Sequence, residues 1–306
     1  MDRRSVLLLC GRVSVGIGAW AVILGACQAR DNGLRKGEAM IRRSAVAGSF
    51  YAGTRERLRL QVEDLLPKGV KQERAIGVVA PHAGYMYSGR VAAAVYSRVE
   101  FPEAFVILGP NHTGMGAGAA IMTYGQWETP LGQVQIDQEL GKAILANSSV
   151  LEEDHLGHLR EHSIEVQLPF LQYFGRPFTF VPISLFSHEY AACHEVGHAV
   201  AKAVRGSKRA VLLVASTDMS HYVTREEATA KDRKAIEAVL ALDPEGLHRV
   251  VRQEGISMCG FHATSAMLVA AKALGATRAE LVMYTDSGDV TRDVKQVVAY
   301  AGLIIR

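Results

Sequence analysis

From Ala45 onward, the chain alternates short, continuous apolar runs with longer amphipathic stretches, and it contains no internal repeat. Short apolar runs are typical of strands covered on both faces, and amphipathic stretches with a period near 3.6 are typical of surface helices. The alternation therefore predicts a single α/β domain, with a mixed, mostly parallel sheet and helices on both faces. The apolar runs expected to form buried strands are residues 75–80, 104–108, 178–185, 210–215, 279–284 and 296–305.

The amphipathic stretches expected to form helices are residues 56–66, 89–98, 138–147, 164–174, 189–205, 226–242, 244–254 and 262–274. Two of these have clear start signals, because Asp243 precedes a proline and Ser88 precedes an alanine-rich stretch. Between the predicted helices at residues 89–98 and 138–147, the sequence alternates apolar and polar residues and contains several glycines. This pattern predicts a hairpin that lies beside the main sheet. Its two arms are expected at residues 119–124 and 132–136.

Length and composition allow one large domain. The chain has 306 residues, 49% of them hydrophobic and 21% charged, so it can bury a sizeable core. The net charge of +3 comes from interspersed signs and only 7% of residues are aromatic, so no nucleic-acid partner is expected. The four cysteines lie far apart and form neither C-x-x-C pairs nor a disulfide framework, so each is considered singly.

The amino terminus has the layout of a secretory signal. A basic start leads into an apolar run over residues 13–24, which is short for a membrane span. The run ends in Leu24-Gly25-Ala26-Cys27, which resembles a bacterial lipobox and predicts a lipid on Cys27 and a membrane-anchored, extracytoplasmic protein. The alternative is a misplaced start codon or an apolar tail on a cytoplasmic protein. The expected segments are a signal over residues 1–27, a polar tether over 28–40 and the domain over 41–306.

Three predicted strands run directly into loops that carry a histidine. These are His82 after residues 75–80, His112 after residues 104–108 and His221 after residues 210–215. In open α/β sheets, ligands bind at the carboxyl ends of the strands, so three such loops on parallel neighbours would aim at one place. A single histidine would more simply be a hydrogen-bonded loop residue. Three in equivalent positions favour a shared site, because imidazole is both a common metal ligand and a common acid/base group.

Cys259 lies just before an alanine-rich helix. A thiol at a helix amino terminus has a lowered pKa, which favours the thiolate that a metal needs. The alternative is a small buried hydrophobic residue, which is what most free cysteines are.

A further polar cluster is Glu161-His162-Ser163-Ile164-Glu165. His162 and Glu165 are three residues apart and would share a helix face, where they would line the site or orient its ligands. Equally, Ser163 would simply cap the helix.

The segment His194-Glu195-Val196-Gly197-His198 matches the H-E-x-x-H pattern of zinc proteases. The apolar stripe of its helix places both histidines toward solvent, and no third ligand follows at the spacing those enzymes use. The pattern is therefore not expected to mark a protease site. The neighbouring Cys193 is expected to be structural.

With these loops assembled, the sequence resembles the Memo family, the B component of a bacterial group that also contains an AMMECR1-like protein and a radical-SAM protein. The resemblance covers residues 42–306. It rests on six collinear motifs: Ala47-Gly48-Ser49-Phe50-Tyr51, Ala80-Pro81-His82-Ala83-Gly84-Tyr85, Leu108-Gly109-Pro110-Asn111-His112, Glu161-His162-Ser163-Ile164-Glu165, Ser216-Thr217-Asp218-Met219-Ser220-His221 and Cys259-Gly260.

The resemblance implies a fold similar to class III extradiol dioxygenases, which hold non-haem Fe(II) with two histidines and a carboxylate. In Memo-like proteins a cysteine replaces that carboxylate. It therefore implies that His82, His112 and Cys259 bind a mononuclear iron or copper ion, with His221 as an acid/base group that Asp218 supports. The pocket or its surroundings would include His162, Glu165, Tyr85 and Asn111.

Two features limit what the resemblance implies. Sulfur with imidazole suits copper(I), iron or zinc, so dioxygenase activity does not transfer automatically. Ala263 stands where many relatives have a proline, and the lipoprotein-like leader is unusual because characterised relatives are mostly intracellular.

Two functions are compatible with these residues. The first is a metal-dependent redox enzyme that activates dioxygen or reduces a bound metal. The second is a non-catalytic module that holds a metal, a small molecule or a peptide in the crevice for partners, with AMMECR1-like and radical-SAM proteins as the partners that the family suggests. His221 and Asp218 favour the enzyme, because a pure carrier needs no acid/base group.

Overall fold

The computed structural model describes residues 40–306 except residues 175 and 187–188. The predicted signal, its Cys27 and the tether up to residue 39 lie outside the described residues. The described residues all belong to one compact unit. Over the part that the structure describes, no helix is both long and apolar enough to cross a membrane.

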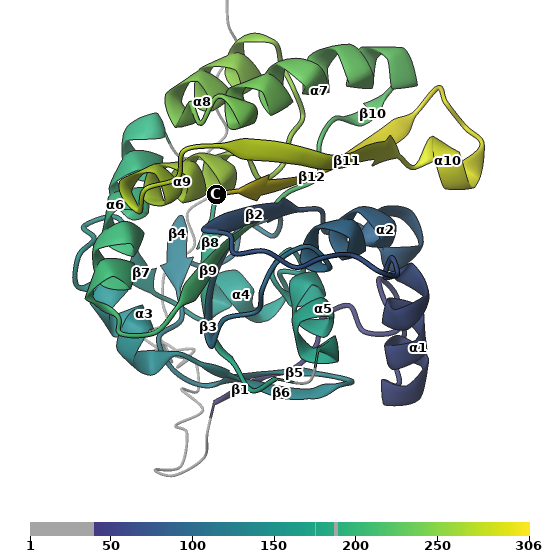
Figure 1. The fold of residues 1–306 in the computed structure, drawn as a ribbon. Coiled ribbons are helices and arrows are strands. Elements are labelled where there is room, and N and C mark those ends of the chain that lie inside the picture. The colour runs from purple at the N-terminus through teal and green to yellow at the C-terminus, as the bar shows by residue number, and fades with distance from the viewer. Residues whose placement is uncertain (1–39, 175, 187–188) are drawn as a thin grey trace, which may run out of the picture. The chain divides into compact units, whose positions relative to one another are not determined.

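A twelve-stranded sheet runs through the domain (Figure 1). Its main path has the order β1-β5-β6-β8-β3-β9-β2-β12-β10, while β11 pairs with β12, and β4 pairs with β8 and β7. The strands are β1 (Ile41–Arg42), β2 (Gly77–Ala80), β3 (Ala104–Pro110), β4 (Ala119–Ile121), β5 (Gln126–Thr129), β6 (Gly132–Ile136), β7 (Glu152–Glu153), β8 (Thr179–Leu185), β9 (Val211–Ser216), β10 (His221–Val223), β11 (Ala279–Asp286) and β12 (Val297–Ile305).

The centre of the sheet is parallel. Strand β9 pairs in parallel with β3 on one side and with β2 on the other, and β3 also pairs in parallel with β8. Strands β11 and β12 are antiparallel additions beyond β2. The prediction of a mixed, mostly parallel sheet is therefore confirmed, and all six predicted strands form within two residues of their expected bounds.

Helices cover both faces of the sheet (Figure 1). On one face lie α1 (Arg55–Leu65), α2 (Tyr85–Tyr96) and α5 (Leu168–Tyr173). On the other lie α3 (Gln138–Leu145), α6 (Tyr190–Gly206) and α9 (Phe261–Ala273), together with α7 (Arg225–Leu240) and α8 (Pro244–Gln253). The remaining helices are short: α4 (Leu156–Leu159), α10 (Gly288–Thr291) and the 3₁₀ helix η1 (Glu165–Gln167).

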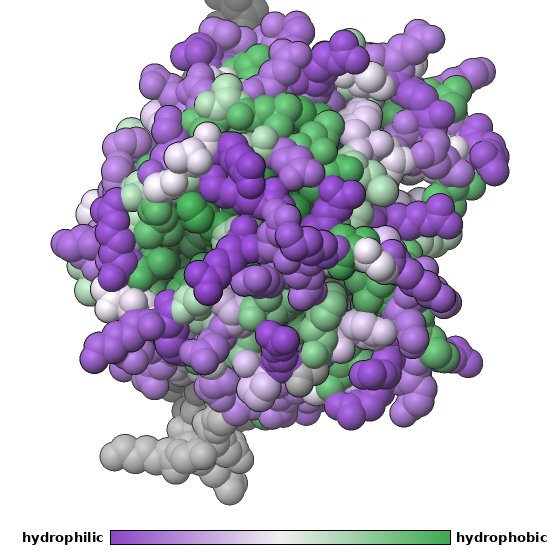
Figure 2. Space-filling model, viewed as in Figure 1, coloured by the Kyte–Doolittle hydropathy of each residue, from purple (hydrophilic) through white to green (hydrophobic). Residues whose placement is uncertain are grey.

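The two helical layers explain why the strands read as continuous apolar runs. In β3, Phe105 and Ile107 pack into the core beside α1, α2 and α5, whereas Val106 and Leu108 pack into the core beside α6 and α9. All four side chains are fully buried. Because successive strand residues point to opposite faces, a strand covered on both sides has no position for a polar residue until it ends. At the outer surface, Figure 2 shows hydrophilic side chains spread over the viewed face, with apolar residues between them.

Three local predictions were wrong. Helix α2 begins at Tyr85 with Gly84 as its N-cap, so Ser88 lies inside the helix, where its hydroxyl donates to the carbonyl of Ala83 (2.9 Å). The hairpin is formed by β5 and β6, whereas β4 pairs with β8, and all three strands belong to the main sheet. The stretch 164–174 divides into η1 and α5. By contrast, the N-cap at Asp243 is confirmed, because its carboxylate accepts from the Gly246 amide (2.8 Å).

Candidate metal centre

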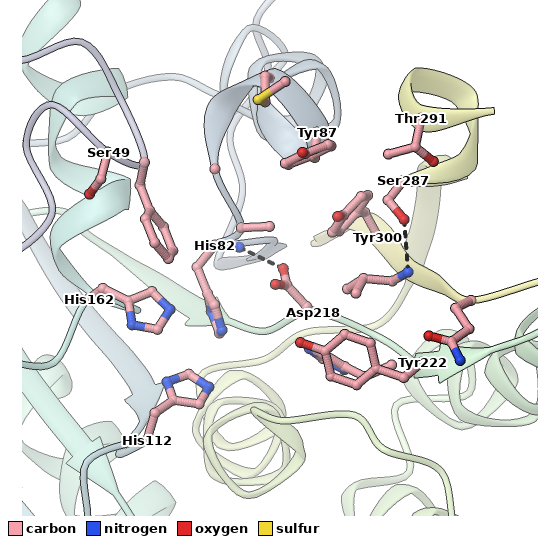
Figure 3. A pocket seen from close by; sticks show the side chains of 17 residues that line it. Ser49, His82, Tyr87, His112, His162, Asp218, Tyr222, Ser287, Thr291 and Tyr300 are labelled. Carbon is pink, nitrogen blue, oxygen red and sulfur yellow. Dashed lines mark hydrogen bonds between the residues drawn. The ribbon is translucent and has the colours of Figure 1, made fainter. Parts of the chain in front are cut away.

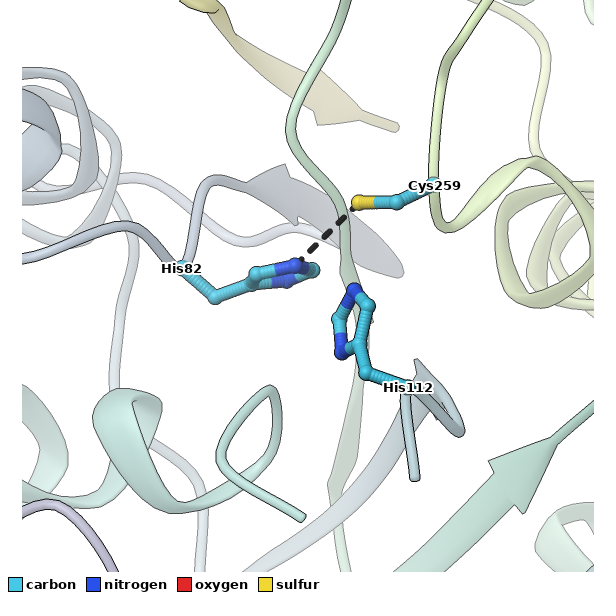
Figure 4. A group of neighbouring side chains, drawn as sticks. All are labelled: His82, His112 and Cys259. Carbon is cyan, nitrogen blue, oxygen red and sulfur yellow. Dashed lines mark hydrogen bonds between the residues drawn. The ribbon is translucent and has the colours of Figure 1, made fainter. Parts of the chain in front are cut away.

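His82 and His112 lie just past the carboxyl ends of β2 and β3, and Cys259 lies just before α9. Their ligand atoms all lie within 4.8 Å of one another (Figure 4). The closest pair is Cys259 Sγ and His82 Nε2, which are 3.2 Å apart. His221 joins His82 and His112 in lining one cavity, so the prediction that three histidine loops meet is confirmed.

The spacing of these atoms suits a single ion. Typical metal–nitrogen bonds of about 2.0–2.1 Å and metal–sulfur bonds of about 2.3 Å place two such ligands about 3.1–3.6 Å apart when their angle at the ion is between 90° and 110°. The 3.2 Å between Cys259 Sγ and His82 Nε2 falls within that range. The group of His82, His112 and Cys259 can therefore hold a metal ion.

A chain of hydrogen bonds fixes the tautomer of His82. The hydroxyl of Ser216 donates its one proton to the carbonyl of Ser163 (2.6 Å), and it accepts from Gln167 Nε2 (2.8 Å). The remaining contact of this oxygen, with His82 Nδ1 (2.9 Å), must therefore be a hydrogen bond that the imidazole donates. His82 Nε2 is left without a proton and faces the thiol. Burial also lowers the pKa of His82 well below its usual value, so the ring is neutral, as a metal ligand must be.

Glu161 orients His112 in the same way. Its carboxylate accepts from His112 Nδ1 (2.9 Å) and from the His112 amide (2.5 Å), which leaves His112 Nε2 free of a proton. It also accepts from the amides of His162 and Ser163. Burial alone would raise the pKa of Glu161, but the hydrogen bonds from His112 and from the Ser163 amide outweigh it and lower this pKa to about 2. Sequence reasoning missed Glu161, although it directly precedes His162 in the motif.

Glu165, expected to line or support the site, instead lies behind it. Its carboxylate forms a buried ion pair with Arg42 and accepts from the hydroxyl of Tyr51 (2.5 Å) and the amide of Ala45 (2.7 Å). Tyr85 is likewise buried away from the cavity lining and donates to the carbonyl of Val166 (2.6 Å). The contacts of Glu165 hold the first described residues against η1, and the contact of Tyr85 holds the start of α2 against it.

Of the remaining residues near the candidate centre, His162 lines the cavity, whereas Asn111 and Ser163 hold the surrounding loops. The ring of His162 stacks on that of His112 with centroids 4.7 Å apart. Asn111 shapes the loop after His112, because its side-chain oxygen accepts from the amides of Thr113 and Gly114. Ser163 does not cap a helix: its hydroxyl donates to the carbonyl of Pro110 (2.9 Å).

The expected lowering of the pKa of Cys259 is wrong. Burial and the nearby Asp218 carboxyl raise the pKa of this thiol, which lies two residues before the first residue of α9, Phe261. The Asp218 amide does donate to the sulfur (3.2 Å). A bound cation would supply the charge that stabilises the thiolate, since metal binding displaces the thiol proton.

Asp218 does not orient His221. Its carboxylate accepts from the His82 amide (2.8 Å), and burial raises its pKa to about 6. The His221 ring is held instead by carbonyls, because its Nδ1 donates to Met219 (2.7 Å) and Ser257 (2.9 Å). This arrangement again leaves Nε2 free of a proton in the neutral ring.

The cavity has a volume of about 580 Å³ and extends from the histidines toward α10 and β12 (Figure 3). Aromatic rings of Phe50, Tyr87, Tyr222 and Tyr300 line it, and no lysine or arginine does so among the described residues. Tyr222 is unusual because its backbone is left-handed, with φ of 58°, and its side chain is 74% exposed. A bulky residue in this conformation is an outlier of the kind that clusters at functional sites.

Comparison with known proteins assigns the family. Residues 42–304 match the family model described as "Memo-like protein". The chain belongs to the Memo family. A MEMO1 family protein of Methanopyrus kandleri is 45% identical, over 87% of this chain and 99% of that protein. Another, from Methanothermobacter thermautotrophicus, is 44% identical over 86% of this chain and all of that protein.

The fold likeness extends to a distant solved structure. An uncharacterized protein of Escherichia coli K12 superimposes with a TM-score of 0.51, over 74% of this Memo-family chain and 99% of the other. At 15% identity, this likeness concerns the fold alone.

The H-E-x-x-H segment lies away from this centre. His194 and His198 are exposed on α6 and do not line the cavity. Glu195 accepts from the amide of Ser149 (2.9 Å), so it is engaged elsewhere. Cys193 is buried among apolar residues, and burial raises its pKa to about 12.

We predict that Ser216→Ala weakens metal affinity by about 10- to 100-fold, because outer-shell partners of a metal-ligating histidine typically contribute that much. Titration of the metal-loaded protein with a competing chelator measures the change. The matched control is Ser184→Ala in β8, on the far side of β3 from the strand of Ser216, where the buried hydroxyl has no hydrogen-bond partner among the described residues and should be dispensable. Equal affinity for the two variants would contradict the role given to Ser216.

Proposed function

We propose that this Memo-family protein is a metal-dependent oxidoreductase with one iron or copper ion at His82, His112 and Cys259, and with zinc as a further candidate. The observation that carries the proposal is the convergence of these three ligand atoms within 4.8 Å. The orientation of both imidazoles by separate hydrogen-bond partners supports it, because ligands of a functional metal are usually held in this way.

The donor set limits which ions fit. Two neutral imidazoles and one thiolate are soft or borderline ligands, which suit copper, iron or zinc far better than magnesium or calcium. When bound, iron or copper would supply one-electron chemistry at the inner end of the cavity. The buried side of the site, where His82 is only 1% exposed, would keep bulk water from this part of the reaction.

His221 is suited to accept a proton from a bound donor. Its Nδ1 proton is committed to two carbonyls, so Nε2 is the nitrogen that is free to act as a base. Asp218 would act indirectly, because its hydrogen bond to the His82 amide holds the loop that carries the first ligand. His162 is neutral, since burial lowers its pKa to about 4, and it would border the same donor.

The lining of the cavity indicates the class of donor. Its aromatic and apolar side chains offer contact area, while the lack of basic side chains among the described residues would leave a carboxylate or phosphate away from the bound ion without a counter-ion. The proposed substrate is therefore an uncharged small molecule or the uncharged side chain of a peptide, oxidised by dioxygen. Cooperation with AMMECR1-like and radical-SAM proteins remains a prediction from the family.

We expect protein purified without oxygen to carry about one iron or copper ion per chain. His82→Ala, His112→Ala and Cys259→Ala should each lose most of this metal, because two remaining ligands bind weakly. Elemental analysis after dialysis measures the content. His155→Ala, which removes an exposed histidine elsewhere, is the control and should keep the metal. Full metal content in all three site variants would contradict the proposed centre.

We expect His221→Ala to keep its metal but to lose about 10²- to 10⁴-fold in turnover, which is the usual contribution of a general base. Oxygen consumption with a catechol or thiol donor measures turnover, and elemental analysis measures the metal. Loss of metal would make His221 a ligand, and unchanged turnover would make it structural. If the wild-type protein retains the metal but consumes no oxygen with such donors, the result favours the alternative function, a non-catalytic binding module.

We further propose that a lipid on Cys27 anchors the protein outside the cytoplasm, on the strength of the lipobox-like Leu24-Gly25-Ala26-Cys27. Each buried CH₂ of an acyl chain contributes about 0.8 kcal/mol to membrane binding, so several chains would hold it firmly. Wild-type protein is expected in the membrane fraction of cells, and Cys27→Ala protein is expected to keep its leader and to lack the lipid by mass spectrometry. Wild-type protein in the cytoplasm with Met1 intact would refute the anchor.

A further inference from the structure

His194 and His198 form a second cluster of metal-ligating side chains, separate from the cavity. They lie one turn apart on α6, both are exposed, and their Nε2 atoms are 3.2 Å apart. Metal–nitrogen bonds of about 2.0–2.1 Å place two imidazole nitrogens between about 2.8 Å and 3.4 Å apart as their angle at the ion opens from 90° to the tetrahedral value. The observed separation therefore lies within the range that one ion requires.

The backbone that carries the two rings is firmly held. Val196 and Val200, on the opposite face of α6, are buried in the core. Between the histidines, Gly197 lies against α9 so closely that a Cβ there would come 2.5 Å from the carbonyl of Ala266. A packed helix keeps the two side chains one above the other, so little backbone order has to be gained when an ion binds.

We propose that His194 and His198 form a surface chelate for a divalent transition-metal ion, namely copper, nickel or zinc. The ion would replace the contact between the two rings, with each neutral ring keeping its proton on Nδ1. Two imidazoles without a carboxylate suit these metals rather than calcium or magnesium. The other coordination positions would hold water, because no third ligating side chain among the described residues completes a group with this pair.

The surroundings indicate binding rather than hydrolysis. The two rings border a hollow of about 300 Å³, together with Tyr190 and Lys272. Glu195, which would be the general base of a zinc protease, is engaged by the amide of Ser149. The exposed ammonium of Lys272 opposes a cation only weakly, since exposed charges are screened by solvent. The site is therefore open, exchangeable and distinct from the buried centre at His82.

Retention of the untagged, detergent-solubilised full-length protein on immobilised Ni²⁺ tests the proposal. The wild type is expected to be retained, whereas His194→Ala and His198→Ala should elute early. Both changes are at exposed positions, and circular dichroism verifies that the variants fold. His155→Ala, the loss of an exposed histidine outside this pair, should elute as the wild type does. Passage of the wild type through the column, or unchanged retention of His198→Ala, would overturn the proposal.

Equilibrium dialysis with Zn²⁺ gives a second, independent measurement. The weaker class of zinc sites in the wild type should lose at least about tenfold in affinity in either variant, because the second imidazole of a chelate binds as an intramolecular ligand. His82→Ala and Cys259→Ala should keep this class of site. If the proposed centre at His82 binds no metal, the zinc affinity of the surface site should therefore stay the same. Loss of the weak zinc site in His82→Ala would overturn the surface chelate.

Discussion

The parallel pairing of β9 with β2 and with β3 is the constraint on which the candidate centre depends. It aligns Val79 and Leu108 with the same residue, Ala215, so that the three strands end together. His82, His112 and the segment with Asp218 and His221 then leave one edge of the sheet. A slip of one residue in either pairing would exchange the two buried faces of a strand, so both hydrophobic cores enforce the register that the site requires.

Much of this arrangement was predictable because it depends on local pattern. The strand runs, and the histidines that follow them, are adjacent in the sequence, and parallel neighbours bring such loops together. What the sequence left open depends on tertiary contacts. The sequence favoured Glu165 for a supporting role, whereas the ion pair of Glu165 with Arg42 and the hydrogen bond from His112 to Glu161 show that Glu161 takes it. The burial that raises the pKa of Cys259, and the Ser257 carbonyl that helps to hold His221, come from chain segments distant in sequence.

The two histidines of the candidate metal centre are oriented by different chemistry. His82 donates to the neutral hydroxyl of Ser216, whereas His112 donates to the ionised carboxylate of Glu161. A carboxylate partner makes an imidazole a stronger electron donor than a hydroxyl does. The candidate centre is thus asymmetric, with the carboxylate-supported imidazole on the more exposed side and the hydroxyl-supported one against the thiol. Fold likeness alone would not reveal this, since one fold supports many chemistries.

Tyr222 carries a cost in stability. A left-handed backbone disfavours any residue with a Cβ by roughly 1–2 kcal/mol, and glycine would avoid that penalty. The exposed ring contributes little burial in return. Replacing Tyr222 with glycine would therefore be expected to stabilise the fold, while removing an aromatic side chain from the mouth of the cavity.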